Sequence, residues 1–528
     1  MNLREAPCGV CGVISDKKCA SCHGIFYCGV KHQKEDWKNH KKSCPPYIVE
    51  CDENVGRFLV ASRNLKFGDV ILKEQPLIIG PSQVTAPVCL GCLQEIQQES
   101  AKKCSRCGWP MCSDDCEKST NHSAECKLTE ARGGITIEHF IAPHPIYQCI
   151  LTLRCLLLKD TSPEKWEKLS QLESHTELRK KTPQWFSDCE SVGKFIPKFF
   201  HCENVWTEEE VMRILGIVYI NGHEVPLTEP PYVAIYSTAS LFEHSCCANV
   251  AKSFTDRGEV VFWAAQDVKK GQRLSICYSD ALWGSQARQE HLKQTKMFKC
   301  ACERCQDFTE FATNFSAIKC EAFRKITDPA CGGLLLPDDD WTNTWKCREC
   351  PRNVVWEDIQ KILEKAGGDL IKMKESVEEA KKFISCYSNV IPENHSMMCD
   401  IKCVLGQKIG EGDPEQLRKI PDDLLEMKAH LCNEMLTLLR ILAPAENRSH
   451  GCMHFELHAA LAEMARRGVQ RGQDCTDLLE KSLIHAEEAT KWLEKEPTIL
   501  VEGKICAQAK VNADSLKMAF RMRDLSSV

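Results

Sequence analysis

The chain has 528 residues, a formal net charge of −6 and 35 cysteines. At roughly 150 residues per domain, this length predicts three or four folded units and excludes a single small disulfide scaffold. Hydrophobic residues make up 43% of the chain and charged residues 27%, proportions that exclude a collagen-like or wholly disordered protein. The slight negative charge disfavours nucleic acid and anionic membranes as partners.

The cysteines bear on the compartment, because thiols persist in reducing surroundings and disulfides in oxidising ones. The first eight residues lack the apolar segment of a signal peptide. The most apolar stretch, 146–158, is too short to span a bilayer and is interrupted by Arg154. We therefore expect an intracellular protein of the cytoplasm and nucleus, without a membrane span, whose cysteines are reduced and largely bound to metal.

Residues 8–44 contain a pattern of eight potential zinc ligands. Cys-x-x-Cys pairs are typical of tight metal-binding turns, and pairs spaced by four residues place two donors on one helical face. The ligands are Cys8, Cys11, Cys19, Cys22, Cys28, His32, His40 and Cys44. Eight donors suffice for two tetrahedral zinc ions and leave no open position for a catalytic water. Because so short a unit buries little apolar surface, we expect zinc to supply its folding energy.

The same pattern returns later in the chain, which argues against ordinary buried thiols. The second set is Cys89, Cys92, Cys104, Cys107, Cys112, Cys116, His122 and Cys126. Both copies resemble the MYND zinc finger, including Phe26-Tyr27 before Cys28 and Trp37 before the last His-x-x-x-Cys. The resemblance implies that the fingers bind peptides or other protein partners.

The resemblance also implies cross-braced sites, in which alternating pairs share a metal. In the first copy, one zinc would bind Cys8, Cys11, Cys28 and His32, and the other would bind Cys19, Cys22, His40 and Cys44. In the second copy, one zinc would bind Cys89, Cys92, Cys112 and Cys116, and the other would bind Cys104, Cys107, His122 and Cys126.

Further motifs flank the second finger. Residues 55–61 and 70–74 predict strands on either side of a turn. Much later come Glu243 to Asn249, a predicted strand at 259–264, Gly271 to Tyr278, and a closing Cys-x-Cys-x-x-Cys. Together these segments resemble the split SET domain of the SET- and MYND-domain protein-lysine methyltransferases. The additional N-terminal finger resembles the arthropod-specific branch of that family.

This resemblance implies a site for S-adenosylmethionine and a lysine channel. The cofactor-binding residues that it implies are Gly56, Arg57, Asn221, Glu243, His244 and Tyr278. Tyr278 would also be catalytic, and Phe298 would form a wall of the lysine channel. The implied reaction is a direct displacement, in which the protein positions a neutral lysine amine in line with the sulfonium methyl group.

Two further cysteine sets predict zinc. By resemblance to the family, Cys246, Cys300, Cys302 and Cys305 form a site that fastens the post-SET segment. Cys320, Cys331, Cys347 and Cys350 are typical of a zinc ribbon, although only the last pair has a short fixed spacing. We therefore expect five zinc ions per chain, and six if the ribbon also binds metal.

Three departures from the family pattern leave two functions open. Phe58 replaces the second glycine of the cofactor turn, Glu243 replaces an asparagine, and Gln272-Arg273 replaces an acidic pair. Tyr278, His244 and Phe298 favour a protein-lysine N-methyltransferase that acts on histone or non-histone proteins. Phe58 and Glu243 favour a catalytically weakened scaffold that binds protein partners, for example in transcriptional repression.

The predicted class is a multidomain α+β protein. Thr207 to Glu210 forms a capping box, which predicts a helix leading into the second SET part. Hydrophobic periodicity predicts consecutive amphipathic helices near the C-terminus. We expect an N-terminal MYND finger at 1–46, the first SET part at 50–88, the second finger at 89–126, a helical insert at 127–206, the core SET part at 207–298, a post-SET zinc segment at 299–306, a ribbon at 307–351 and a tetratricopeptide-like helical domain at 352–528.

Overall fold

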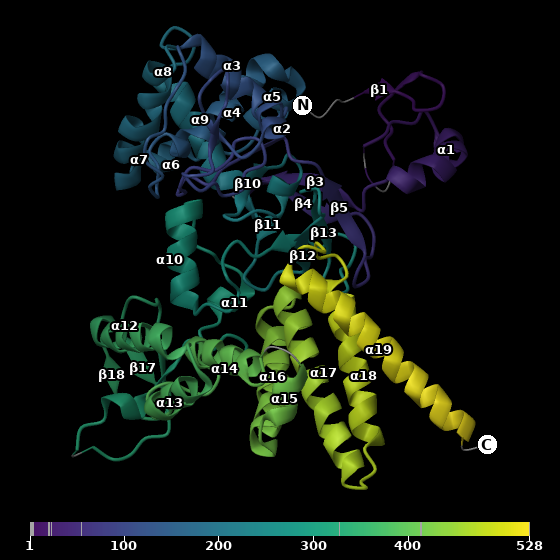
Figure 1. Cartoon of the computed structure of the whole chain (residues 1–528), viewed down its shortest axis with the longest axis vertical. Helices are drawn as coiled ribbons and strands as arrows, with labels where there is room; N and C mark the ends of the chain where they lie inside the picture. Colours follow the sequence, from purple (N-terminus) through teal and green to yellow (C-terminus); the bar gives the residue numbers. More distant parts are fainter. Residues whose placement is uncertain are drawn as a thin grey trace.

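The computed structural model describes residues 5–19, 22, 24–53, 55–326, 328–411 and 414–526. Most of the longer strands lie at residues 47–80 and 222–276 and helices fill the C-terminal third, so the expected mixture of α and β structure is confirmed. Figure 1 shows the N-terminal finger projecting to one side of the strands, and the last helices gathered below them.

The first finger, residues 6–44, is built from two short strands and one helix. Strand β1 (Ala6–Pro7) pairs with β2 (Ile14–Ser15), and α1 spans Val30–Ser43. Because α1 begins at Val30, Cys28 lies before the helix and Cys44 caps its end. The prediction of a shared helical face is therefore wrong for Cys28 and His32, whereas Cys44 directly follows the last turn of the helix that carries His40. Buried residues of the finger form a hydrophobic cluster of their own.

The β core consists of small sheets that combine distant parts of the chain. Its strands are β3 (Tyr47–Asp52), β4 (Gly56–Ala61), β5 (Val70–Glu74), β6 (Ile78–Gly80), β9 (Gly222–Val225), β10 (Tyr232–Ile235), β11 (Glu243–His244), β12 (Val250–Phe254), β13 (Val260–Ala264) and β14 (Ser275–Ile276). Strand β5 pairs with β13 and β6 with β10. Segments before and after residues 89–206 therefore form one folded unit.

The inserted segment contains the second finger, residues 89–126, and a layer of helices. Its elements are β7 (Lys102–Lys103), β8 (Pro110–Met111), α2 (Asp114–Glu117), α3 (Ser123–Ala131), α4 (Tyr147–Thr161), α5 (Pro163–Ser170), α6 (Thr176–Arg179), α7 (Pro183–Asp188) and α8 (Phe195–Phe199), and α9 (Glu208–Asn221) follows it and packs against it. The Thr207 side chain accepts a hydrogen bond from the Glu210 amide, which confirms Thr207 as the N-cap of α9. The Glu210 carboxylate accepts a hydrogen bond of 3.3 Å from the Lys159 amine. Unlike the first finger, the second finger shares one hydrophobic cluster with these helices.

After the β core, α10 (Ser285–Lys296) and α11 (Glu303–Gln306) lead to a four-stranded sheet. Its strands are β15 (Ile318–Lys319), β16 (Leu334–Pro337), β17 (Trp345–Cys347) and β18 (Asn353–Val354). The C-terminal helical array follows with α12 (Trp356–Met373), α13 (Val377–Tyr387), α14 (Ser396–Lys408), α15 (Pro414–Lys419), α16 (Asp422–Leu442), α17 (Asn447–Gln470), α18 (Thr476–Leu493) and α19 (Val501–Ser526). Among the described residues, we find no helix with the length and apolar character needed to cross a bilayer.

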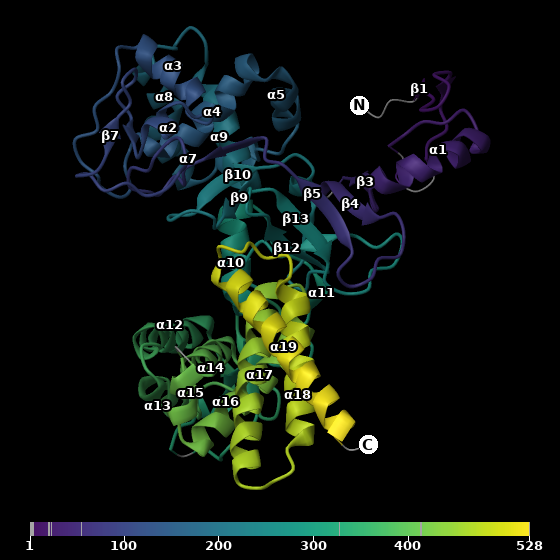
Figure 2. The same ribbon diagram turned by 45° about the vertical axis from the view of Figure 1, so that its right-hand side comes forward.

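Aromatic side chains fasten the helical array to the β core. Trp492 of α18 lies with its ring centroid 4.7 Å from that of Phe67, which belongs to the turn before β5. The Trp492 ring also stacks on His450 of α17, with centroids 4.2 Å apart. Figures 1 and 2 show α17, α18 and α19 running side by side away from β12 and β13. The array therefore rests on the face of the β core that carries these strands.

Candidate functional site

In the described part of the chain, at least five groups of cysteine and histidine side chains have their donor atoms within 4.8 Å of one another. The groups are Cys8, Cys11, Cys28 and His32; Cys19, Cys22, His40 and Cys44; Cys89, Cys92, Cys112 and Cys116; Cys104, Cys107, His122 and Cys126; and Cys246, Cys300, Cys302 and Cys305. These are the sets that the family resemblance implies. Four thiolate or imidazole donors at such distances suit tetrahedral zinc, so the clusters support zinc binding.

The expected ribbon cysteines also approach one another. The sulfur atoms of Cys320 and Cys350 are 3.6 Å apart, and those of Cys331 and Cys347 are also 3.6 Å apart. Gly333 has no room for a side chain, because a Cβ atom there would lie 2.7 Å from the Cys347 sulfur. The arrangement suits a sixth four-donor site beside the sheet β15 to β18.

The second finger is tied to its surroundings by a buried polar chain. The His122 Nδ1 atom lies 3.2 Å from a carboxylate oxygen of Glu125, and the same carboxylate binds the Arg154 guanidinium. Arg154 also donates hydrogen bonds to the carbonyl oxygens of Ile79 (2.9 Å) and Leu90 (2.7 Å). A carboxylate on the second nitrogen of a metal-binding imidazole fixes the orientation of its ring. Arg154 thus connects a metal-ligand cluster with the β core.

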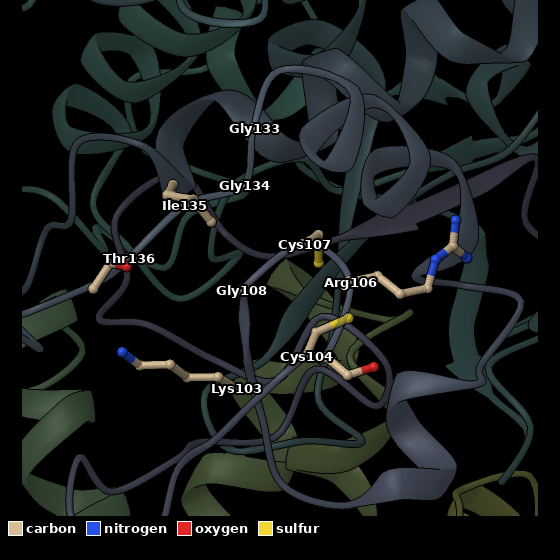
Figure 3. Close-up of a pocket in the computed structure, with 10 residues that line it drawn as sticks. Lys103, Cys104, Arg106, Cys107, Gly108, Gly133, Gly134, Ile135 and Thr136 are labelled. Carbon is tan, nitrogen blue, oxygen red and sulfur yellow. The ribbon is translucent and has the colours of Figure 1, made fainter.

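A shallow hollow lies beside the same finger (Figure 3), between residues 103–108 and 133–136. Lys103 and Arg106 extend to opposite sides of the Cys104–Cys107 turn. Gly108 allows the two segments to approach, because a Cβ atom there would lie 2.0 Å from the Ile135 carbonyl oxygen. The hollow shares no lining residue with the predicted cofactor site.

Strands β11 and β14 bring the predicted catalytic residues together. The pair is parallel, with His244 opposite Ile276. His244 Nδ1 accepts a hydrogen bond of 3.0 Å from the backbone amide of Tyr278. The His244 ring centroid is 5.2 Å from that of Tyr278 and 5.7 Å from that of Phe298. His244, Tyr278 and Phe298 therefore form one aromatic group beside the Cys246 cluster.

The Tyr278 hydroxyl is positioned as a hydrogen-bond donor. It donates to the carbonyl oxygen of Phe242. Burial raises the pKa of Tyr278 far above its usual value, and the negative charge of Glu243 acts in the same direction. The phenol consequently stays protonated at neutral pH. It can orient a reacting group without giving up its proton.

The predicted cofactor turn lies at the tip of the hairpin formed by β3 and β4. Gly56 has a φ angle of +77°, and a Cβ atom there would meet no atom within 4 Å. This left-handed conformation favours glycine. Arg57 is exposed, and its guanidinium donates to the Gln171 carbonyl oxygen at the end of α5. The Arg57 side chain is thus engaged with the helical insert.

Arg273, which itself departs from the family pattern, contacts Phe58 and Glu243, which also depart from it. Its guanidinium donates to Glu243 (2.8 Å) and to Asp52 (2.6 Å), and lies 3.9 Å from the ring centroid of Phe58. Burial raises the pKa of Glu243, and the ion pair with Arg273 opposes that shift. Glu243 is therefore neither isolated nor a free negative charge. We call Arg273, Glu243, Asp52 and Phe58 the Arg273 cluster.

Asn221, which the family resemblance implies as a cofactor-binding residue, lies at the end of a helix. It is the last residue of α9, and its amide donates to the carbonyl oxygens of Glu173 (2.8 Å) and Ile217 (2.9 Å). Its side-chain nitrogen is thus engaged within the helical insert. The adjacent carbonyl of Ile220 accepts a hydrogen bond of 2.7 Å from the Lys296 amine.

Lys296 is a site residue that sequence reasoning missed. It ends α10, and its Nζ atom lies 5.6 Å from the ring centroid of Tyr278. Burial lowers the pKa of Lys296 to about 8, and the nearby charge of Lys252 contributes. No spacing in the sequence relates Lys296 to Tyr278, although it stands two residues before Phe298.

A cavity of about 390 Å³ separates the β core from the start of α17. Ile276 and Cys277, which immediately precede Tyr278, line it together with Lys252 and Glu446. Burial raises the pKa of Glu446 to about 7, and the charge of Asp280 adds to this shift. The cavity thus presents both a lysine and a carboxyl group next to the strand that leads to Tyr278.

Several known proteins are similar to this chain. Residues 8–44 match the MYND finger family. The SET domain-containing protein SmydA-8, isoform A, of Drosophila melanogaster is 25% identical over 315 residues, which are 58% of this chain and 65% of that protein. The histone-lysine N-methyltransferase ASHR1 of Arabidopsis thaliana is 23% identical over 416 residues, 76% of this chain and 82% of that protein. The histone-lysine N-methyltransferase SMYD3 of Homo sapiens is 25% identical over 266 residues, 48% of this chain and 59% of that protein.

Proposed function

We propose that this chain, which belongs to the family of SET- and MYND-domain proteins, is an S-adenosylmethionine-dependent N-methyltransferase of protein lysine residues. One observation carries the proposal: His244, Tyr278 and Phe298 meet beside the four-cysteine cluster of Cys246. The relatives named as lysine methyltransferases support the same reaction class. Histone and non-histone proteins are both candidate substrates.

The residues of the site suit a reaction that needs positioning more than bond-making by the protein. Bound S-adenosylmethionine would supply an electrophilic sulfonium methyl group. The proposed contacts with it come from Gly56, Arg57, Asn221, Glu243, His244 and Tyr278. The protonated Tyr278 hydroxyl, held by the Phe242 carbonyl, orients the acceptor amine. Phe298 and the Tyr278 ring exclude water from the acceptor.

We extend the proposal to the division of the chain. The β core with residues 50–88 and 207–298 would form the split SET domain, and residues 299–306 its post-SET segment. The two fingers and the C-terminal helical array would recruit protein partners. Complete four-donor sets in the fingers, the post-SET segment and the ribbon predict five or six zinc ions.

The Arg273 cluster favours a second candidate, a scaffold with little turnover. Phe58 is 4% exposed and lies under the Arg273 guanidinium, so its ring occupies space that a second glycine would leave open. In a weakened site, wild-type affinity for S-adenosylmethionine would be low. The double substitution Phe58→Gly with Glu243→Asn would then raise the affinity, because it removes both the ring and one carboxylate.

Calorimetric titration of the full chain with S-adenosylmethionine separates the two candidates. The methyltransferase predicts saturable binding at one site per chain, together with transfer of a labelled methyl group to protein lysines. Weak wild-type binding that the double substitution strengthens would support the scaffold. Tight binding by the wild type without transfer to any histone or cytoplasmic protein would contradict both, and would leave a scaffold that senses the cofactor.

A further inference from the structure

The side chain of Lys296 reaches the proposed acceptor site from within the chain. Helix α10 ends at Lys296, and Met297 then adopts a left-handed conformation with φ +62°. The Lys296 amine crosses to the last turn of α9, where it donates to the carbonyl oxygens of Ile220 (2.7 Å) and Tyr219 (3.5 Å). The primary amine at the end of α10 therefore binds the end of α9.

That location coincides with the aromatic group around Tyr278. The Lys296 amine lies 5.6 Å from the Tyr278 ring centroid, and Phe298 follows it by two residues. Neighbouring lysines behave differently: Lys293 is exposed on the same helix, and Lys299 pairs with Asp340 of the ribbon. Among these three lysines, only Lys296 has its amine next to Tyr278, the residue that the proposed reaction uses.

We propose that Lys296 is a modification site of the chain itself, methylated intramolecularly by the proposed SET site. The proposal rests on the proposed function, because it uses the same methyl donor and the same Tyr278. The inference adds a methyl acceptor that belongs to the chain itself, so no second protein is needed as substrate. To react, the amine would first have to leave the Ile220 carbonyl oxygen to which it donates.

The chemistry balances with a sulfonium methyl donor as the one co-reactant. The Lys296 ammonium first loses a proton to solvent, and its lone pair then attacks the methyl carbon. A nitrogen–carbon bond forms while the carbon–sulfur bond breaks, and the thioether leaves with the bonding electron pair. The lowered pKa of Lys296 increases the neutral fraction of the amine compared with an ordinary lysine.

The test uses the full-length, zinc-loaded chain with S-adenosylmethionine labelled in its methyl group. We expect the label on the peptide that contains Lys296, with a mass increase of one methyl group. Lys296→Arg should lower labelling at least about tenfold, whereas the matched control Lys293→Arg should retain it. Tyr278→Phe should also lose the label. Because transfer is intramolecular, the rate per chain should not change on dilution.

The outcomes distinguish this inference from the proposed function. Methyl transfer to other proteins with an unlabelled Lys296 would overturn the inference alone. A labelling rate proportional to protein concentration would overturn the intramolecular route. Absence of both cofactor binding and transfer would overturn the two proposals together. Zinc content and circular dichroism of Lys296→Arg establish that the variant folds, and the Tyr278→Phe labelling does not depend on that variant.

Discussion

Near the tip of the hairpin formed by β3 and β4, a single guanidinium binds two carboxylates and covers an aromatic ring. Arg273 carries one positive charge between Glu243 and Asp52. Replacing Glu243 alone leaves Arg273 paired with Asp52, whereas replacing Arg273 leaves two neighbouring carboxylates without a counter-charge. Substitutions in the Arg273 cluster therefore act together and need to be compared as double-mutant cycles.

The Tyr278 hydroxyl is the group whose removal tests the proposed reaction most directly. Tyr278→Phe keeps the ring and deletes the donor to the Phe242 carbonyl. We expect cofactor affinity to survive while turnover falls by about one to three orders of magnitude, as measured by labelled methyl transfer. Tyr147→Phe, which deletes a buried hydroxyl bound to the Val88 carbonyl, is the matched control. Equal losses in both variants would contradict a specific role for Tyr278.

A buried charge group lies next to the proposed post-SET segment, residues 299–306. Glu310 binds both Arg288 (3.1 Å) and Arg304 (2.7 Å), and all three side chains are inaccessible to solvent. Removing the carboxylate would leave two buried guanidinium groups without their shared partner. We therefore expect Glu310→Ala to lower the free energy of unfolding by about 3–5 kcal/mol, as measured by urea denaturation. The exposed Glu290→Ala is the control, with an expected change below about 0.5 kcal/mol.

The same group makes stability depend on pH. Burial opposes ionisation of Glu310, but Arg288 and Arg304 hold its pKa below the usual value. A depressed folded-state pKa gives stability that is complete above the unfolded-state value of about 4.3 and is lost as the pH falls through the folded value. The urea midpoints of wild type and Glu310→Gln should therefore converge in acid. If the difference between the two urea midpoints stayed constant as the pH fell below about 4.3, the stabilising role of the ionised Glu310 would be contradicted.

At the scale of elements, the zinc-binding units are the most predictable parts of the chain. Their cysteine spacing defines which residues meet, because each metal requires four nearby donors. The start of the helix within the first finger was less predictable, because Gly29 is extended and the helix begins only at Val30. The role of Arg154 could not be inferred, because Glu125 and the carbonyls of Ile79 and Leu90 approach it only through tertiary packing. The Lys296–Tyr278 contact escaped sequence reasoning for the same reason.

The post-SET cluster offers a prediction at this scale. Cys302→Ser removes one of four donors from the Cys246 site. We expect the loss of one zinc ion per chain and roughly tenfold weaker cofactor binding, because the segment carrying Phe298 is no longer fastened. The first finger should stay folded. Cys386→Ser, at an exposed cysteine, is the control. Simultaneous loss of the first finger would show that the proposed domain division is wrong.

At the scale of the whole molecule, the metal content tests the architecture. Six complete donor sets predict five or six zinc ions per chain, according to whether the ribbon is loaded. Elemental analysis of the purified chain provides the measurement. Two zinc ions or fewer would contradict the assignment of the fingers.

The contact between the helical array and the β core provides a second test at this scale. Trp492 is 8% exposed and packs against Phe67, Trp263 and His450. We expect Trp492→Ala to cost about 3–5 kcal/mol and to separate the unfolding of the array from that of the β core. The exposed Trp283→Ala should leave one shared transition. A single unchanged transition in Trp492→Ala would show that other contacts join the two parts.

The two fingers differ in how they are anchored, and this difference bears on what the loss of either finger would do to the rest of the chain. The first finger has its own hydrophobic cluster and joins the β core where the Ser62 amide donates to the Pro46 carbonyl. The second finger shares its cluster with the helical insert, and its histidine is linked through Arg154 to β6. Loss of the first finger would therefore leave the packing of the β core intact. Loss of the second would expose part of the hydrophobic cluster that it shares with the helical insert.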